Sequence, residues 1–274
     1  MHNALISSVL GLVLVLLAPV ASAHPRPKDF FLDPPKKGLY AHADAFTAGL
    51  QLSLEHRAEL DGDLTMLTTR ASGLASLGFS EVALQSELRV AFLALGGTVG
   101  YRNTWRNYSA APGDKFTIAQ RREADAGKSF TAQDWAFAEA RARLIIPMDS
   151  LWFIGTGTLR YEDSPANSFD WFHATMHDGG TLTKLEAVLF LRSKSLGAIG
   201  PAVRYMDMPR GGSRIGEFAF GFTGGTRVGL KKHSDMALLQ VLAMPASDEF
   251  GFHFYNLPVW IMASYRMSFE VGDI

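Results

Sequence analysis

Residues 217–230 read EFAFGFTGGTRVGL, a run in which two kinds of residue alternate. Phe218, Phe220 and Phe222 fall on one parity, whereas small residues and Arg227 fall on the other. Successive side chains of a β-strand point to opposite faces, so this period of two predicts an extended strand with one apolar face. Any fold containing this strand must cover the phenylalanine face with a protein core or with lipid.

The same alternation recurs along most of the chain and predicts an all-β fold. Candidate strands lie at 39–62, 63–76, 80–92, 95–106, 132–146, 151–161, 181–192, 196–206, 216–230, 235–244 and 257–271. Short and long connections alternate between them, which is typical of a single antiparallel meander. Closed bacterial barrels of one chain carry an even number of strands. We therefore predict a transmembrane β-barrel of about 12 strands, with the missing strand hidden in 39–62 or 76–96, and ten strands as the alternative.

The N-terminus carries the layout of an export signal. An apolar run from Leu5 leads to Pro19 and the small residues Ala21-Ser22-Ala23, which predicts a signal peptide over 1–23 that is cleaved before His24. The run is preceded by no Lys or Arg, so an uncleaved membrane anchor is the alternative. Residues 24–38 form a Pro-rich leader, and 39–271 form the barrel.

Composition restricts the partners of the chain. There is no Cys, so neither disulfides nor a lipid-modified cysteine contributes. The formal net charge of −1 argues against a nucleic-acid partner. Charged residues make up 19%, below the roughly 25% typical of soluble domains, although no apolar run beyond the signal is long enough for a membrane helix. No motif calls for a cofactor, and we predict none.

The types of charged residue indicate which face of the strands contacts water. Every Lys except Lys184 lies outside the predicted strands, whereas Arg residues lie within them among small residues and Glu. A soluble sheet covers its water face with Lys and Glu, but a crowded interior suits paired Arg and Glu. A soluble β-sandwich or lipocalin, apolar inside, is the alternative. We predict that the charged face lines a lumen and that the phenylalanine face meets lipid. The predicted lumen-lining residues are Glu87, Arg89, Arg102, Glu139, Arg141, Arg143, Arg160, Lys184, Glu186, Arg192, Arg204, Glu217, Arg227 and Arg266.

The last strand, LPVWIMASYRMSFEVGDI, alternates toward a terminal aromatic residue, Phe269. In this respect the chain resembles the Gram-negative outer-membrane β-barrel class. The resemblance implies location in the cell outer membrane, contact with outer-membrane lipid, and recognition of the C-terminal strand by the barrel-assembly machinery. The chain departs from the pattern because five residues, 270–274, follow the aromatic residue.

Loop length predicts topology. The polar segments 108–130 and 162–180 are expected on the outer side, and the tight turn PMDS at 147–150 on the periplasmic side. The second loop contains the one cluster with metal-binding chemistry, formed by Asp170, His173, His177 and Asp178. The alternative role for this cluster is solvation or packing within the loop.

The function predicted from these patterns is porin-like passive passage of small solutes, anions included, through the Arg/Glu-lined lumen. An enzyme acting on outer-membrane lipid, phospholipid or lipid A, is the second hypothesis. No GxSxG motif is present, but a Ser and a His on neighbouring strands could still meet. A closed structural barrel, with its charges paired across a narrow interior, is the third.

Overall fold

The computed structural model describes residues 37–47, 49–61, 65–108, 117–127, 130–148, 150–170, 175–193, 197–230, 233–244, 252–254 and 257–272. The predicted signal peptide and nearly all of the predicted leader lie outside these residues. Among the described residues, no helix is both long enough and apolar enough to cross a membrane.

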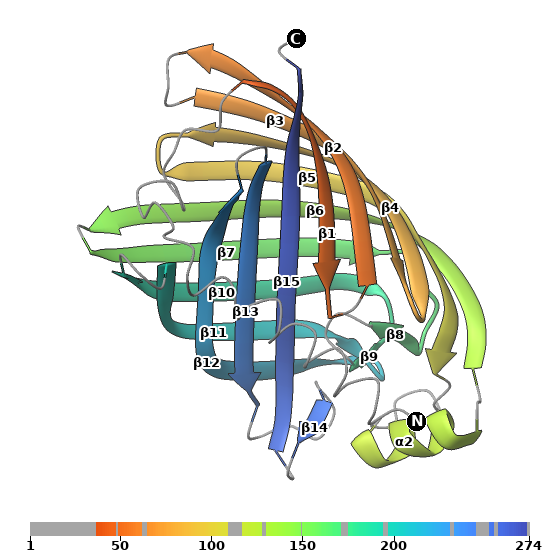
Figure 1. Cartoon of the computed structure of the whole chain (residues 1–274). Helices are drawn as coiled ribbons and strands as arrows, with labels where there is room; N and C mark the ends of the chain where they lie inside the picture. The colour runs from red at the N-terminus through yellow and green to blue at the C-terminus, as the bar shows by residue number, and fades with distance from the viewer. Residues whose placement is uncertain are drawn as a thin grey trace.

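Twelve long strands form one antiparallel sheet that closes on itself (Figure 1). In barrel order they are β1 (Gly38–Phe46), β2 (Gly49–Asp61), β3 (Thr65–Ser76), β4 (Phe79–Val90), β5 (Leu93–Tyr108), β6 (Phe130–Met148), β7 (Leu151–Glu162), β10 (Gly180–Ser193), β11 (Gly197–Arg210), β12 (Ser213–Leu230), β13 (His233–Ala243) and β15 (Leu257–Gly272). Each pairs with its neighbour in sequence, and β1 pairs with β15. The predicted twelve-strand meander is confirmed.

The strand that the sequence pattern concealed lies before residue 62. Residues 39–62 hold two strands, because a hairpin turn at Thr47 separates β1 from β2 and pairs Phe46 with Gly49. A single strand over 39–62 would place Phe46 and Leu50 on one face, and this expectation is therefore wrong. In the paired strands Leu50 lies opposite Ala45, on the other face of the sheet from Phe46. A two-residue turn reverses which parity faces outward.

The two faces of β12 differ as the alternation predicts. Phe218, Phe220 and Phe222 are 55%, 48% and 63% exposed, whereas Ala219 and Thr223 between them are 1% and 4% exposed. The same pattern continues around the barrel, where Leu52, Val82, Leu95, Val99, Leu159, Leu185 and Ile199 are exposed. The outer wall is thus an apolar belt, and the opposite parity faces the lumen. Arg227 belongs to β12, but its side chain lies outside the described part of the chain.

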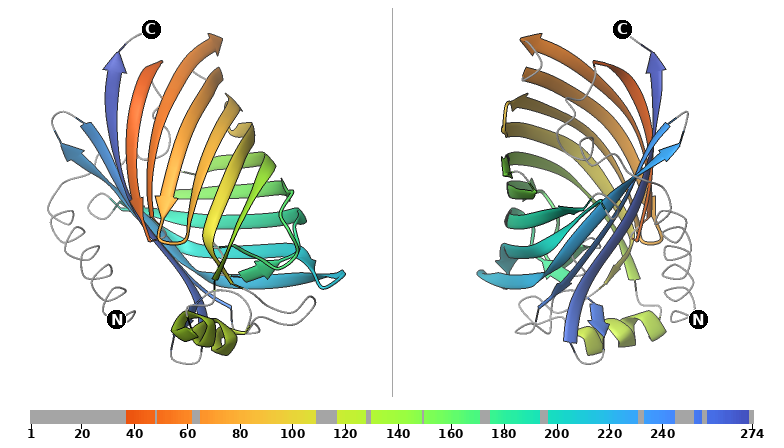
Figure 2. Two further views of the ribbon diagram at one scale, coloured as in Figure 1. Left: turned by 90° about the vertical axis from the view of Figure 1, so that its right-hand side faces the viewer. Right: turned by 60° about the vertical axis from the view of Figure 1, so that its left-hand side comes forward.

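The two ends of the barrel differ in their connections. The helix α2 (Ile118–Gly127), the small hairpin of β8 (Ser168–Asp170) and β9 (Thr175–His177), and the short strand β14 (Phe252–Phe254) lie at one end (Figure 2). We call this the loop end. The C-terminal end of β15 and the turn after Met148 lie at the opposite end, the turn end. The predicted loop 108–130 thus contains a helix, and Pro147 and Met148 of the predicted turn are the last residues of β6.

Candidate functional site

Charged side chains on the luminal parity form ion pairs between strands. Glu87 of β4 accepts hydrogen bonds from Arg141 at 3.1 Å and from Arg143 at 2.7 Å, and both arginines lie on β6. Arg160 of β7 lies 3.7 Å from Glu139. The structure therefore brings these five predicted lumen residues together in pairs between strands, as a crowded interior requires.

A second cluster crosses the seam where the barrel closes. Asp44 of β1 accepts hydrogen bonds from Arg266 of β15 at 2.5 Å and from Arg70 of β3 at 3.0 Å. Only Arg266 was among the predicted lumen residues. Asp44 was missed because the hidden turn at Thr47 obscured the luminal parity of β1.

The β8–β9 hairpin folds into the lumen at the loop end. Its residues Ser168, Phe169, Met176 and His177 are at most 1% exposed. Phe169 and Met176 pack with Tyr108 at the end of β5. Since the loop lies inside rather than above the barrel, it narrows the lumen.

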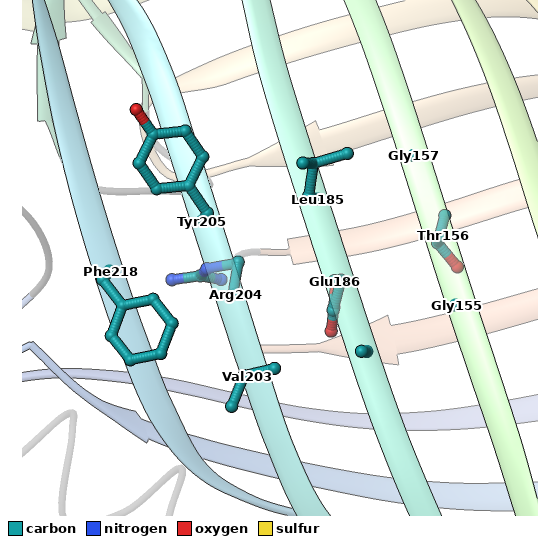
Figure 3. A pocket seen from close by; sticks show the side chains of 10 residues that line it. Gly155, Thr156, Gly157, Leu185, Glu186, Val203, Arg204, Tyr205 and Phe218 are labelled. Atoms are coloured by element: carbon teal, nitrogen blue, oxygen red, sulfur yellow. The ribbon is translucent and has the colours of Figure 1, made fainter.

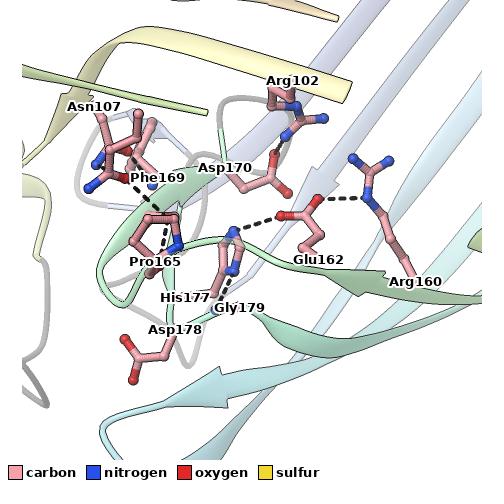
Figure 4. Close-up of polar contacts among 12 residues, drawn as sticks. Arg102, Asn107, Arg160, Glu162, Pro165, Phe169, Asp170, His177, Asp178 and Gly179 are labelled. Atoms are coloured by element: carbon pink, nitrogen blue, oxygen red, sulfur yellow. Dashed lines mark hydrogen bonds and ion pairs between the residues drawn. The ribbon is translucent and has the colours of Figure 1, made fainter. Parts of the chain in front are cut away.

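Asn107 of β5 fastens this hairpin to the barrel wall (Figure 4). Its side-chain oxygen accepts a hydrogen bond from the backbone N–H of Phe169 at 2.6 Å, and its Nδ2 donates to the carbonyl of Asn167 at 3.3 Å. Nδ2 also donates to Gln133 of β6 at 2.8 Å. Asn107 is buried, so the loss of these bonds would leave buried backbone groups unpaired.

An ionic network continues from the hairpin into the lumen. Arg102 of β5 donates two hydrogen bonds to Glu81 of β4, at 2.6 and 2.9 Å, and lies 3.7 Å from Asp170 of the hairpin. Glu162, at the end of β7, accepts a hydrogen bond from Arg160 at 2.6 Å. Figure 4 shows the contact of Arg102 with Asp170 and that of Arg160 with Glu162.

His177 is fully buried, with a hydrogen bond at one ring nitrogen and a carboxylate near the other. Its Nδ1 accepts a hydrogen bond from the Gly179 N–H at 3.1 Å, so the neutral ring carries its proton on Nε2. That nitrogen lies 3.3 Å from Oε2 of Glu162. Burial lowers the pKa of His177 below its ordinary value despite the nearby carboxylates of Glu162 and Asp170. At neutral pH the ring is therefore uncharged.

The three described residues of the predicted metal cluster, Asp170, His177 and Asp178, have different partners. Asp178 lies 3.3 Å from Arg210 and accepts hydrogen bonds from the backbone N–H groups of Asn167 and Gly211. Burial would raise the pKa of Asp178, but these contacts hold it below its ordinary value. His173 lies outside the described residues. Within the described ranges, no group of three or more His, Asp or Glu side chains has an arrangement suited to a metal ion.

A cavity of about 250 Å³ lies in the lumen beside the hairpin. Charged residues of both signs line it, the cations Arg102, Arg160, Lys184 and Arg204 and the carboxylates Glu139, Glu162, Asp170 and Glu186. The apolar part of the lining is formed by Leu182, Met206, Met208, Trp260 and Met262. The lining thus combines charged groups with a polarisable apolar surface, which suits a small molecule with both characters.

A second hollow, of about 340 Å³, lies on the outer wall (Figure 3). Gly155 and Gly157 of β7 supply no side chains there, and Leu185, Tyr205 and Phe218 border the space. The register places Gly157 opposite Leu185 and Tyr205 opposite Phe218. Because these neighbours are exposed and apolar, the hollow is part of the apolar belt.

A serine, a histidine and a glutamate meet at the seam. Ser268 Oγ of β15 lies 2.9 Å from Nδ1 of His42 on β1, and Nε2 of His42 lies 3.7 Å from Glu55 on β2. Glu55 also accepts a hydrogen bond from Arg57 at 2.5 Å. Sequence analysis missed this group because Ser268 and His42 stand 226 residues apart. The sequence pattern near each residue indicated only that Ser268 and His42 lie on the luminal parity of their strands, and not that they meet.

No protein-family model matches the chain, and no curated protein matches it. Among solved structures, the chain is similar to LpxR from Salmonella typhimurium, with 7% identity, TM-score 0.43, and coverage of 85% of this chain and 99% of LpxR. The translocator domain of the autotransporter NalP from Neisseria meningitidis shows 11% identity, TM-score 0.41, and coverage of 97% and 96%. The CymD monoaromatic hydrocarbon channel shows 10% identity, TM-score 0.40, and coverage of 89% and 92%.

The chain's own architecture decides its class. Twelve antiparallel strands form a closed barrel, the exposed outer wall is apolar, and the charged parity is turned inward. A soluble barrel would bury the apolar parity and expose the charged one. With lipid-facing and lumen-facing residues alternating along its closed sheet, this chain is a β-barrel protein of the Gram-negative outer membrane.

Proposed function

We propose that the barrel passes small solutes, with a preference for anions. The observation that carries this proposal is the presence of luminal cations without partners. Among the described residues, none forms a hydrogen bond or an ion pair with Arg89, Lys184 or Arg204. A purely structural lumen would be expected to pair such charges, because an uncompensated charge inside a protein costs free energy. Unpaired cations along a lumen favour the entry of anions.

The β8–β9 hairpin is the constriction in this proposal. It is held by hydrogen bonds to Asn107, by the ionic contact of Asp170 with Arg102, and by one small apolar cluster. Polar contacts of this kind can be exchanged for contacts with water more cheaply than a large apolar core can be exposed. We therefore infer that the hairpin leaves the lumen reversibly and that solutes pass when it does.

Planar-bilayer recording of the refolded chain in a salt gradient tests the proposal. The expected result is a steady current with a reversal potential of anion-selective sign. Replacement of Arg89 by Gln should reduce that selectivity, whereas replacement of the paired Arg266 should affect it less. A barrel that inserts but stays silent under all conditions, or that selects cations, would contradict the proposal.

The seam supports a second candidate, hydrolysis of carboxylic esters. In this reaction Ser268 Oγ attacks the ester carbonyl carbon while Nδ1 of His42 takes the hydroxyl proton. The alcohol then leaves with that proton, and water hydrolyses the acyl-serine. Glu55 would stabilise the protonated ring of His42. The group faces the lumen and not the outer wall, so its substrate would be an ester that enters the barrel.

A fluorophosphonate probe separates the two candidates. If Ser268 is a nucleophile, the probe labels the folded wild-type barrel and fails to label Ser268→Ala, while Ser264→Ala, a change on the same luminal parity of β15, leaves labelling intact. An unlabelled wild-type barrel would remove the ester-hydrolysis candidate and leave the passage proposal untouched.

We further infer that the barrel-assembly machinery recognises β15. The strand carries outward-facing Tyr265, Met267 and Phe269, and it continues to Gly272 in its pairing with β1. Phe269→Ala should slow insertion into membranes that contain the machinery more than it slows spontaneous insertion into detergent micelles. Equal slowing in both would contradict the inference.

A further inference from the structure

Arg204 is a buried cation with which no described side chain forms a hydrogen bond or an ion pair. It lies on the luminal parity of β11 and is 3% exposed. Its guanidinium carbon lies 4.2 Å from the centre of the Trp260 ring. Contact with an aromatic face compensates only part of the cost of burying a cation. The arrangement leaves the guanidinium available for an anion.

Glu186, Asp170 and Glu217 act electrostatically on Arg204, but none of the three forms an ion pair with it. Glu186 is directly opposite Arg204 in the β10–β11 register, but it accepts a hydrogen bond from Gln240 of β13 at 2.6 Å. Asp170 of the hairpin lies beside Arg102 at 3.7 Å. In the described part of the chain, no carboxylate comes within ion-pair distance of Arg204. An incoming anion would not have to displace one from it.

Lys184 supplies a second cation to the same space. The register pairs Lys184 with Met206 and Glu186 with Arg204, so Lys184 and Arg204 are diagonal neighbours on the luminal face. Diagonal neighbours stand roughly 7–8 Å apart, a separation that one carboxylate with two oxygens can bridge between long side chains. Both line the lumen cavity, and Lys184 also lacks a partner among the described residues.

The remainder of the cavity is suited to an apolar body. Met206, Met208 and Met262 line it together with Trp260 and Leu182. Thioethers are polarisable and adapt their rotamers, so such a surface accepts rings and short chains of varied shape. The volume of about 250 Å³ limits the occupant to a compact molecule. An inorganic anion would leave the methionine side unused.

We propose that this cavity binds a small organic monoanion, with its carboxylate on Arg204 and Lys184 and its compact apolar body against the methionines and Trp260. This inference specifies the class of solute for the proposed passage. It depends on the proposed passage only for the route by which the anion reaches the cavity. Benzoate fits the description and serves as the probe, and benzamide serves as its neutral counterpart of similar shape.

Isothermal titration calorimetry of the refolded full chain in detergent tests the site. Benzoate should bind at least about tenfold more tightly than benzamide, because only benzoate carries a charge for the two cations. Sodium chloride at the same ionic strength should compete weakly. Equal affinity for benzoate and benzamide, or no detectable binding of benzoate, would overturn the proposal.

Variants locate the binding. Arg204→Gln should weaken benzoate binding by about tenfold or more, and Lys184→Gln by a smaller factor. Arg89→Gln is the matched control, because Arg89 is another luminal arginine without a described partner but does not line this cavity. An equal loss in Arg89→Gln would show general attraction to a cationic lumen and would refute the site. If Arg204→Gln does not show the heat-modifiable gel migration of a folded barrel, the affinity of Lys184→Gln for benzoate and the benzoate-benzamide comparison test the site instead.

The same preparations separate this inference from the passage proposal. Benzoate binding without any current would leave the site standing and defeat the passage. Anion-selective current without benzoate binding would leave the passage standing and defeat the site. When both hold, benzoate should reduce the current through the wild-type barrel and not through Arg204→Gln.

Discussion

At the scale of the residue, the parity of a side chain in its strand decides its surroundings. Phe220 and Ala219 are neighbours in sequence, yet one is 48% exposed on the outer wall and the other is 1% exposed. Arg102 occupies the luminal parity of β5, where Glu81 and Asp170 surround it. A charge on the luminal parity is therefore tolerated because oppositely charged side chains lie beside it. A charge on the outer parity is costly because it contacts lipid.

Phe220 offers the sharpest test of this rule. Phe220→Arg places a cation near the middle of the apolar belt and should destabilise the inserted barrel by about 2–4 kcal/mol, measured by reversible unfolding in lipid vesicles. Phe220→Leu keeps the position apolar and should change stability little. Spin labels attached to single cysteines at 218, 220 and 222 should be relaxed by lipid-soluble oxygen, and labels at 219, 221 and 223 should not. Similar accessibility on both parities would contradict the membrane assignment of this face.

At the scale of the element, the β8–β9 hairpin is a short sheet of its own, separate from the barrel sheet. Its two strands pair only with each other, through Ser168 with His177 and Phe169 with Met176. Side-chain contacts and one backbone hydrogen bond, from the Asp178 N–H to the Pro209 carbonyl at 2.9 Å, hold it in the lumen, without a shared ladder. Such an element can move as a unit without breaking the closed sheet, which is what a gate requires.

Asn107→Ala should loosen the hairpin. The substitution leaves the backbone N–H of Phe169 without its acceptor, at a cost of about 1–3 kcal/mol, and should raise the open fraction in single-channel records by at least about fivefold. Asn103→Ala, an exposed position on the same strand, is the control and should behave as wild type. Unchanged gating in Asn107→Ala would show that the hairpin is not the constriction.

Acidification should also release the hairpin. Burial holds the pKa of His177 below its ordinary value while the hairpin is docked, although Glu162 and Asp170 raise it and Arg102 and Arg160 lower it further. Once released, His177 regains its ordinary value of about 6.5 and binds a proton more readily than the docked form. The free energy that favours the docked hairpin is therefore largest above about pH 6.5 and decreases as the pH falls below that value.

Channel recordings at pH 7.5 and pH 5 measure this effect. The open fraction should rise at pH 5 in the wild-type barrel, and the rise should shrink in His177→Gln, which cannot titrate. An identical rise in both would assign the effect to other groups.

At the scale of the whole molecule, the two ends of the barrel are unlike. The loop end carries α2 and the inward hairpin, and the turn end carries short connections such as the one at Ser150. Long loops of outer-membrane barrels face the cell exterior, and short turns face the periplasm. We therefore expect the loop end outside, as the loop lengths in the sequence predict.

Two single-cysteine variants of this Cys-free chain test the orientation. A membrane-impermeant maleimide added to intact cells should label Arg122→Cys, an exposed position of α2, and should spare Ser150→Cys until the outer membrane is opened. The reverse pattern would invert the assignment.

The sequence predicted the features that repeat and missed those that occur once. The parity of Phe218, Phe220 and Phe222 predicted an apolar outer wall because every strand repeats the same period. The turn at Thr47 was missed because apolar residues occupy alternate positions on both sides of it. Contacts such as Asp170 with Arg102 were beyond prediction, because no local pattern specifies where a loop folds back.

The pair of Ser268 and His42 has a consequence for timing. One residue belongs to the last long strand and the other to the first, so their contact forms only when β15 meets β1. Contacts between such distant parts of a chain form late in folding, because a long segment must first be ordered between them. Any reactivity of this serine would therefore be absent during export and would begin at the moment the barrel closes. Assembly itself would then act as the maturation step of this site.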